Sequence, residues 1–236
     1  MAALIPTPPL PDIARARGDT VPEMGEWFVE YFNMRPIPWN YRRSPRIIKQ
    51  AYKGLHSLPP LIAGCMDEKN TTGRSSNMEV VNLTAPLAFG RKTQVFDLTP
   101  RRFHFGRDRS AAYRVPFFFV ENGVIKVYLL QPRKGAGLDL NEFGMVATAM
   151  KKYLLDVEFY GQKIDIEFVD VSCPEPKAAR LVQRYTLSDL KLWSEKRLSD
   201  RLTLISQALD WAAESGRIEK RRRIARRPEP EMPLFD

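Results

Sequence analysis

Two polar side chains bracket a pair of apolar segments in VPFFFVENGVIKVYLLQPRK, residues 115–134. Glu121 ends the first segment and Gln131 ends the second. Carboxylate and amide oxygens can bind a divalent cation, and a carboxylate can help to activate water for attack on a phosphodiester. Glu121 and Gln131 are therefore the candidate catalytic residues if this chain cleaves a substrate.

Basic residues gather beside the same stretch. Arg133 and Lys134 come directly after Gln131. Guanidinium and ammonium groups bind phosphate without reading base sequence, and a guanidinium can pair with two phosphate oxygens at once. The candidate nucleic-acid contacts are Arg101, Arg102, Arg107, Arg109, Arg133 and Lys134.

A β-hairpin is the element that must position these residues. Residues 115–121 and 124–131 carry apolar side chains on both faces, and Asn122-Gly123 between them favours a type I′ turn. Apolar side chains on both faces indicate central strands that are covered on each side. A helix over residues 138–157 and a strand over residues 163–172 are expected to follow. The predicted fold is α/β, with a mixed central sheet flanked by helices.

The rest of the chain divides around this core. Proline-rich residues 1–21 are expected to be disordered or strapped onto the surface. Residues 22–172 form the predicted α/β core, in which the Gly, Ser, Asn and Thr of residues 64–90 indicate a long loop. Residues 173–215 are predicted to be a helical C-terminal segment packed on the core. Residues 216–236 are expected to be a basic, disordered tail.

The order of these elements resembles the core of the PD-(D/E)XK nuclease superfamily over residues 44–184. In that family a hairpin carries Pro-Asp at the start of one strand and Glu-X-Lys at the end of the next. Here Pro116 matches the proline, and Phe117 stands at the aspartate position. Gln131-Pro132-Arg133 stands in place of Glu-X-Lys, with Lys134 adjacent. The resemblance implies a restriction-endonuclease-like core.

The departures from the family pattern bear on cleavage. Phe117 supplies no metal ligand, and Arg133 stays protonated, which makes it a poor general base. Asp165 and Glu167, at i and i+2 of a strand, are a second source of carboxylates. The sequence favours a site without metal-dependent cleavage over an active nuclease. No cofactor is expected, and Mg²⁺ only if residual nuclease activity exists.

Charge and composition limit the classes of partner and the cellular location that are expected. The net charge is +9, which fits either a polyanionic partner or a solvated basic surface with a disordered tail. No apolar run reaches the ~20 residues that a membrane-spanning helix needs, so no membrane partner is expected. Cys65 and Cys173 are far apart in sequence and are expected to be reduced thiols of a cytoplasmic protein.

Two functions remain open at this point. The first is a nucleic-acid-associated protein with a nuclease-like fold, for which DNA is expected ahead of RNA. The alternative is a protein-interaction or scaffold subunit of a larger assembly, without nucleic-acid contact. In both, a protein partner could bind the C-terminal helix or the tail, whose prolines and terminal Leu234-Phe235 suit a docked peptide.

Overall fold

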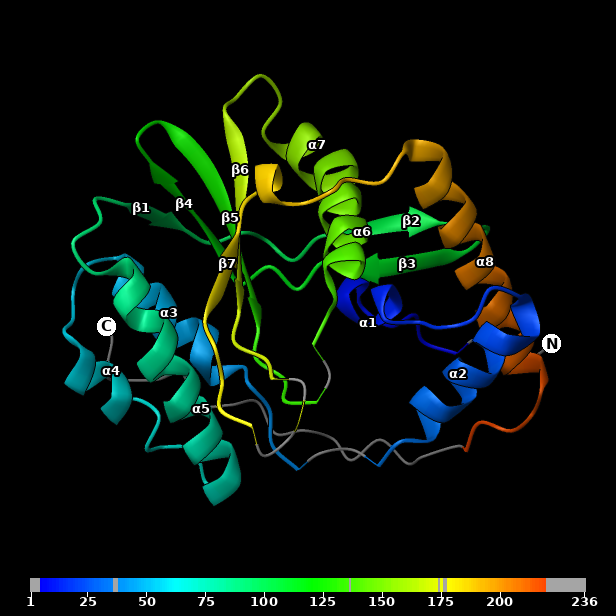
Figure 1. Cartoon of the computed structure of the whole chain (residues 1–236), viewed down its shortest axis with the longest axis horizontal. Coiled ribbons are helices and arrows are strands. Elements are labelled where there is room, and N and C mark those ends of the chain that lie inside the picture. The colour runs from blue at the N-terminus through cyan, green and yellow to red at the C-terminus, as the bar shows by residue number, and fades with distance from the viewer. Residues whose placement is uncertain (1–4, 36–37, 136, 174, 176–177, 220–236) are drawn as a thin grey trace.

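A five-stranded mixed sheet forms the centre of the protein (Figure 1). The computed structural model describes residues 5–35, 38–135, 137–173, 175 and 178–219. In spatial order the strands are β1 (Gln94–Phe96), β4 (Phe117–Glu121), β5 (Val124–Gln131), β6 (Ile164–Asp170) and β7 (Gln183–Tyr185). β5 and β6 are parallel, and the other neighbours are antiparallel. The predicted α/β fold with a mixed sheet is confirmed.

Helices cover both faces of this sheet (Figure 1). One face packs against α3 (Arg43–Tyr52), α4 (Leu58–Ala63), α5 (Thr71–Thr84) and the 3-10 turn η1 (Ala85–Ala88). The other face packs against α6 (Leu140–Met150), which continues into the π-helical turn η2 (Lys151–Leu155) and α7 (Asp156–Glu158). Strand alternation sends Phe117 and Tyr128 into the first core and Val127 and Leu129 into the second.

The second core extends past α6 into a further group of elements. These are α1 (Leu10–Ala14), α2 (Val21–Asn33), α8 (Glu195–Glu214) and a two-stranded sheet of β2 (Arg102–Phe105) and β3 (Arg109–Ala112). α2 and α8 pack closely because Gly25 faces the ring of Trp211, where an added Cβ would lie 2.2 Å from a ring carbon. Among the described residues, no helix combines the length and apolar character needed to cross a bilayer.

The hairpin of β4 and β5 forms as the sequence predicts. Asn122 and Gly123 both have positive φ, 52° and 74°, as a type I′ turn requires. The register pairs Glu121 with Val124 and Phe117 with Tyr128. Because β5 is hydrogen-bonded to β4 on one side and β6 on the other, it is a central strand.

The proline-rich start of the chain is folded into the core. Residues 5–21, for which disorder or a surface strap was the expectation, contain α1 and begin α2. Leu10 and Ile13 of α1 are fully buried. Pro9 is the N-cap of α1 and Pro11 lies in its first turn, where a missing N–H costs no helical hydrogen bond.

Residues 64–90 are not the long loop that their composition indicates. Most of this range is α5 and η1. Asn70 caps α5 by accepting a hydrogen bond from the Gly73 N–H at 2.8 Å. Val80 and Val81 are fully buried against the sheet core. Tertiary packing therefore stabilises a helix whose Thr, Ser, Gly and Asn residues have weak helix propensity.

The C-terminal segment is only partly helical. Before α8, the predicted helical region contains the edge strand β7 and the 3-10 turn η3 (Leu187–Asp189). Ser194 then caps α8 by accepting from the Arg197 N–H. α8 packs on the core as predicted, with its buried side chains provided by Leu198, Leu202, Ile205 and Leu209. Of the predicted disordered tail, residues 220–236 lie outside the described residues.

Candidate functional site

The structure separates the two candidate catalytic residues. Glu121 adjoins the turn, whereas Gln131 ends β5, seven residues beyond the Val124 that pairs with Glu121. At about 3.3 Å per residue, this places the two on the order of 23 Å apart. Alternation also places them on opposite faces of the sheet, because Glu121 shares a face with Tyr128. The structure therefore does not bring the two candidate catalytic residues together, and they cannot act on one scissile bond.

Glu121 belongs instead to an ion-pair network on the α3 face of the sheet. Both of its oxygens accept hydrogen bonds from Arg91, each at 2.7 Å, and Lys126 Nζ donates at 2.9 Å. Arg91 also donates to Glu167, to which Tyr52 donates as well. The hydrogen bonds from Arg91, with smaller contributions from Lys126, lower the pKa of Glu121 to about 2. A carboxylate this acidic is a weak general base at neutral pH.

The second source of carboxylates also serves the fold. Glu167 is buried and bonded to Arg91. Asp165 accepts from the backbone N–H groups of Ile166 and Leu187 at 2.8 and 2.9 Å, which anchors η3 to β6. Over the described part of the chain, no group of at least three His, Cys, Asp or Glu side chains could hold a metal ion.

Of the six predicted phosphate contacts, Arg109 is placed inside the protein. Its side chain is 3% exposed. It donates to the Ile5 carbonyl oxygen at 2.9 Å and forms an ion pair with Asp210 of α8. Arg109 therefore joins the N-terminal segment to α8, and its prediction as a phosphate contact is wrong.

The remaining five basic residues divide between two places. Arg101, Arg102 and Arg107 are exposed on or beside the β2–β3 hairpin, where Arg101 pairs with Glu158. Lys134 pairs with Glu79 of α5 at 3.3 Å. Arg133 is the only one of the six that lines the cavity described next.

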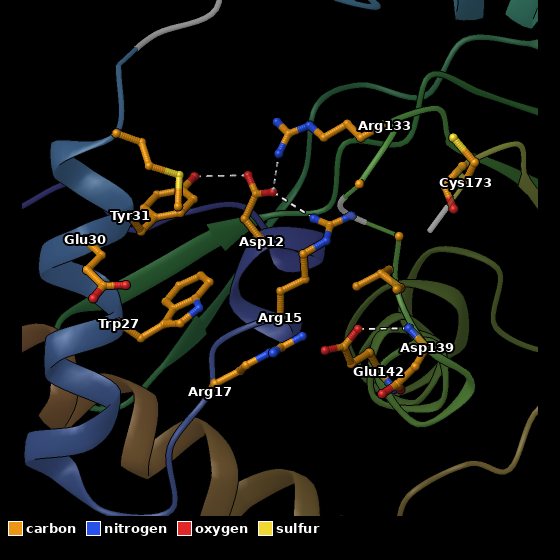
Figure 2. Close-up of a pocket in the computed structure, with 15 residues that line it drawn as sticks. Asp12, Arg15, Arg17, Trp27, Glu30, Tyr31, Arg133, Asp139, Glu142 and Cys173 are labelled. Carbon is orange, nitrogen blue, oxygen red and sulfur yellow. Dashed lines mark hydrogen bonds and ion pairs between the residues drawn. The ribbon is translucent and has the colours of Figure 1, made fainter. Parts of the chain in front are cut away.

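A cavity of about 770 Å³ lies beyond the carboxyl ends of the parallel strands β5 and β6 (Figure 2). Ligands of α/β proteins commonly bind outside these strand ends. α1 and α2 form one side, and the segments after β5 and β6, with the start of α6, form the other. Its polar and aromatic lining comprises Asp12, Arg15, Arg17, Trp27, Glu30, Tyr31, Arg133, Asp139, Glu142, Ser172 and Cys173.

Asp12 organises the floor of this cavity. The carboxylate is buried, and it accepts hydrogen bonds from Arg15 Nη1 at 2.9 Å, Arg133 Nη1 at 3.1 Å and the Tyr31 hydroxyl at 3.1 Å (Figure 2). Burial and the neighbouring Asp12 raise the pKa of Tyr31 to about 12, so this hydroxyl stays a donor at neutral pH. One carboxylate thus fixes side chains from α1, α2 and the end of β5.

Arg15 has hydrogen-bonding capacity that the described protein does not use. Its Nη1 donates to Asp12 and to the Pro11 carbonyl oxygen, each at 2.9 Å. Its Nε and Nη2 are buried and have no hydrogen-bond partner among the described residues. These two atoms form the side-on edge with which a guanidinium binds two oxygens of a carboxylate or phosphate. The pKa of Arg15 is lowered below its usual value, because burial removes water from around the charged guanidinium.

An unpaired buried donor costs about 1–3 kcal/mol. An oxyanion that reached the Nε–Nη2 edge of Arg15 would recover this free energy. Both atoms are covered from solvent, so a ligand oxygen must displace the atoms over them. The arrangement can therefore hold an anionic group at the floor of the cavity.

The rest of the lining carries both signs of charge. Arg17 is exposed at the rim, and Asp139 and Glu142 form the capping box of α6, with hydrogen bonds of 2.7 and 2.9 Å. Burial raises the pKa of Glu142. In total three arginines face four carboxylates, so the lining as a whole does not attract anions, and among its described residues the unused edge of Arg15 is the one place that favours an anionic group.

Sequence reasoning missed the contribution of α1 and α2 to this site. The available indication was PDIARAR, in which Asp12 and Arg15 follow a proline at helical i, i+3 spacing. The high proline content of residues 1–21 instead indicated a disordered or surface segment.

Comparisons with known proteins add little to this description. No protein-family model matches the sequence, and no curated protein matches it. Among solved structures, the crystal structure of SSO0001 is similar over 79% of this chain and 85% of that chain, at 11% identity and a TM-score of 0.34. A likeness at that TM-score carries no argument about function.

Proposed function

We propose that this protein associates with nucleic acid through a phosphate held on Arg15, and that its nuclease-like fold lacks metal-dependent cleavage. The observation that carries the proposal is the buried Nε–Nη2 edge of Arg15, which has no partner among the described residues. Arg17 and Arg133 line the same cavity and supply further positive charge.

The order of elements supports the nuclease-like part of the proposal. α5, β1, the β4–β5 hairpin, α6 and β6 occur in the order of the core that the sequence resembles, with η1 and the β2–β3 hairpin as additional elements before β4. In that resemblance Gln131-Pro132-Arg133 replaces Glu-X-Lys, and Arg133 lines the cavity. An arginine-bearing cavity thus lies beside the strand end where the family would carry its acid and lysine.

The surroundings of the hairpin support the absence of cleavage. Phe117, at the family's aspartate position, is fully buried and stacks on Tyr128 with ring centroids 4.6 Å apart. Glu121 is held ionised by Arg91 and Lys126 at the other end of the hairpin. Phe117 has no carboxylate, and the carboxylate of Glu121 lies far from Gln131. Neither residue can therefore complete a metal site beside Gln131.

Long-range electrostatics favour a polyanionic ligand. The net charge of +9 attracts phosphate backbones, and the exposed arginines of the β2–β3 hairpin add a second basic surface. We assign that surface, formed by Arg101, Arg102 and Arg107, a weaker and strongly salt-dependent contribution.

Fluorescence anisotropy with a labelled oligonucleotide over a range of salt concentrations tests the proposal. Arg15→Met is expected to weaken binding roughly tenfold or more, because a hydrogen bond to a charged group contributes about 1.5–3 kcal/mol. Arg42→Gln is the matched control, since Arg42 is exposed beside α3, away from the cavity lining. Arg42→Gln should change the affinity for the oligonucleotide little.

Two results would contradict the proposal. An absence of binding at low salt would remove the nucleic-acid function. Nicking of DNA that depends on Mg²⁺ or Mn²⁺, and that Gln131→Ala abolishes, would show that cleavage is retained.

A further inference from the structure

We infer that the cavity takes one unpaired nucleotide, with its phosphate on the guanidinium edge of Arg15 and its base against the indole of Trp27. This inference rests on the proposed function and names the form of nucleic acid that the site accepts. It predicts recognition of single strands or frayed ends in preference to closed duplexes.

The size of the cavity sets the first limit. A volume of about 770 Å³ is within the range of small-molecule and cofactor sites, about 300–1,000 Å³. A base in a duplex is stacked and paired between two backbones, so its face reaches the cavity wall only when the base leaves the helix. A nucleotide that is already unpaired avoids this unstacking cost.

The wall formed by α2 provides an aromatic surface. Trp27 and Tyr31 are one helical turn apart, and their rings stack at 5.4 Å with an interplanar angle of 17°. Tyr31 is fixed by its hydrogen bond to Asp12, and Trp27 also packs edge-on against Phe28 at 5.1 Å. In Figure 2 the indole extends from α2 toward Arg15, and Arg17 lies below it in this view. A pre-organised indole of this kind stacks a base for about 1–3 kcal/mol.

The charges of the lining argue for one nucleotide and against a run of phosphates. The four carboxylates would repel a chain of phosphates that followed the cavity wall. Glu30, three residues after Trp27 on α2, is exposed and lines the cavity. A carboxylate accepts from the exocyclic amine of cytosine, and adenine and guanine carry such amines too. Thymine has none, so the site should favour the other bases.

Binding measured with four probes tests this inference. The probes are a 5′-phosphorylated single-stranded oligo-deoxyadenylate, a blunt duplex of the same length, dAMP and inorganic phosphate. The single strand should bind roughly tenfold more tightly than the duplex and quench tryptophan fluorescence, given a stacking contribution of about 1–3 kcal/mol. Trp27→Leu should lose this preference and most of the quenching, whereas Trp27→Phe should keep the preference.

Trp193→Phe is the matched control, because Trp193 packs near α8 under Arg197, at 3.8 Å, and does not line the cavity. This variant should keep the single-strand preference. Thermal melting of each variant separates loss of binding from loss of the fold.

The outcomes distinguish the inference from the proposed function. If single strand and duplex bind equally and Trp27→Leu changes neither, while Arg15→Met weakens both, the inference is overturned and the proposed function stands. If Arg15→Met changes no probe, both are overturned. If dAMP binds as tightly as the oligonucleotide, the cavity inference holds with a free nucleotide as its ligand. If inorganic phosphate binds equally tightly, the contact with the base is overturned.

Discussion

The carboxylate of Asp12 lies 3.1 Å from the guanidinium of Arg133, so a short helix near the N-terminus is tied to the end of the central strand β5. The two residues are 121 positions apart in sequence. Through the same carboxylate, Arg15 and Tyr31 are held at the cavity floor. The N-terminal segment is therefore part of the candidate site.

Asp12→Asn should destabilise the protein strongly. The variant keeps the size of the side chain but removes the counter-charge for Arg15 and Arg133. Removing one partner of a buried ion pair costs about 3–5 kcal/mol. Urea denaturation measures the change in the free energy of unfolding. Asp108→Asn, in the exposed turn between β2 and β3, is the control and should change stability little; an equal loss in the two variants would contradict this role of Asp12.

Oligonucleotide binding should raise the melting temperature through Arg15. A ligand at one hundred times its Kd stabilises the native state by about 2.7 kcal/mol, which shifts melting by several degrees. In Arg15→Met, a tenfold loss of affinity should reduce this shift by about half at the same ligand concentration. A variant that melts with the full ligand-induced shift would show that the oligonucleotide binds elsewhere.

Glu121 should make the stability of the protein depend on pH in the acid range. Its pKa is about 2 in the folded protein and about 4.3 in an unfolded chain. A lowered folded-state pKa stabilises the native protein above about pH 4.3, and this contribution is lost as the pH falls toward 2. The difference corresponds to about 3 kcal/mol at most.

Glu121→Gln tests that dependence by urea denaturation at several pH values. The variant should be less stable than the wild type by about 1–3 kcal/mol at pH 7, and the gap should close below about pH 2. Glu214→Gln, at the exposed end of α8, serves as the control. A gap of constant size across this pH range would show that the charge of Glu121 is not what stabilises the hairpin.

Two arginines of one hairpin should behave differently when changed to glutamine. Arg107 is exposed in the turn, and Arg107→Gln should weaken oligonucleotide binding modestly and reduce the salt slope by about one unit, with no effect on stability. Arg109 is buried and paired with Asp210, so Arg109→Gln should lower the melting temperature. A lower melting temperature in Arg107→Gln, with none in Arg109→Gln, would contradict the placement of these side chains.

The sequence predicted the features that depend on local chemistry. Asn122-Gly123 required positive φ and specified the hairpin. Apolar residues on both faces of β5 indicated a central strand, which followed from burial on each side. These patterns were sufficient for the fold class, because each lies within a few neighbouring residues.

The parts that the sequence did not predict depend on contacts between distant segments. α5 is a helix because Asn77 and the buried valines pack against other elements, despite weak local propensity. The burial of Arg109 depends on Asp210, 101 residues away. The cavity likewise joins α1 and α2 to the ends of β5 and β6, which no local pattern specifies.

A crystal structure of the protein with a 5′-phosphorylated single-stranded oligonucleotide tests the central claim most directly. We predict a phosphate oxygen within about 3 Å of Arg15 Nε or Nη2, and a base stacked on Trp27. An oligonucleotide bound along the β2–β3 hairpin, with no phosphate at Arg15, would contradict this prediction.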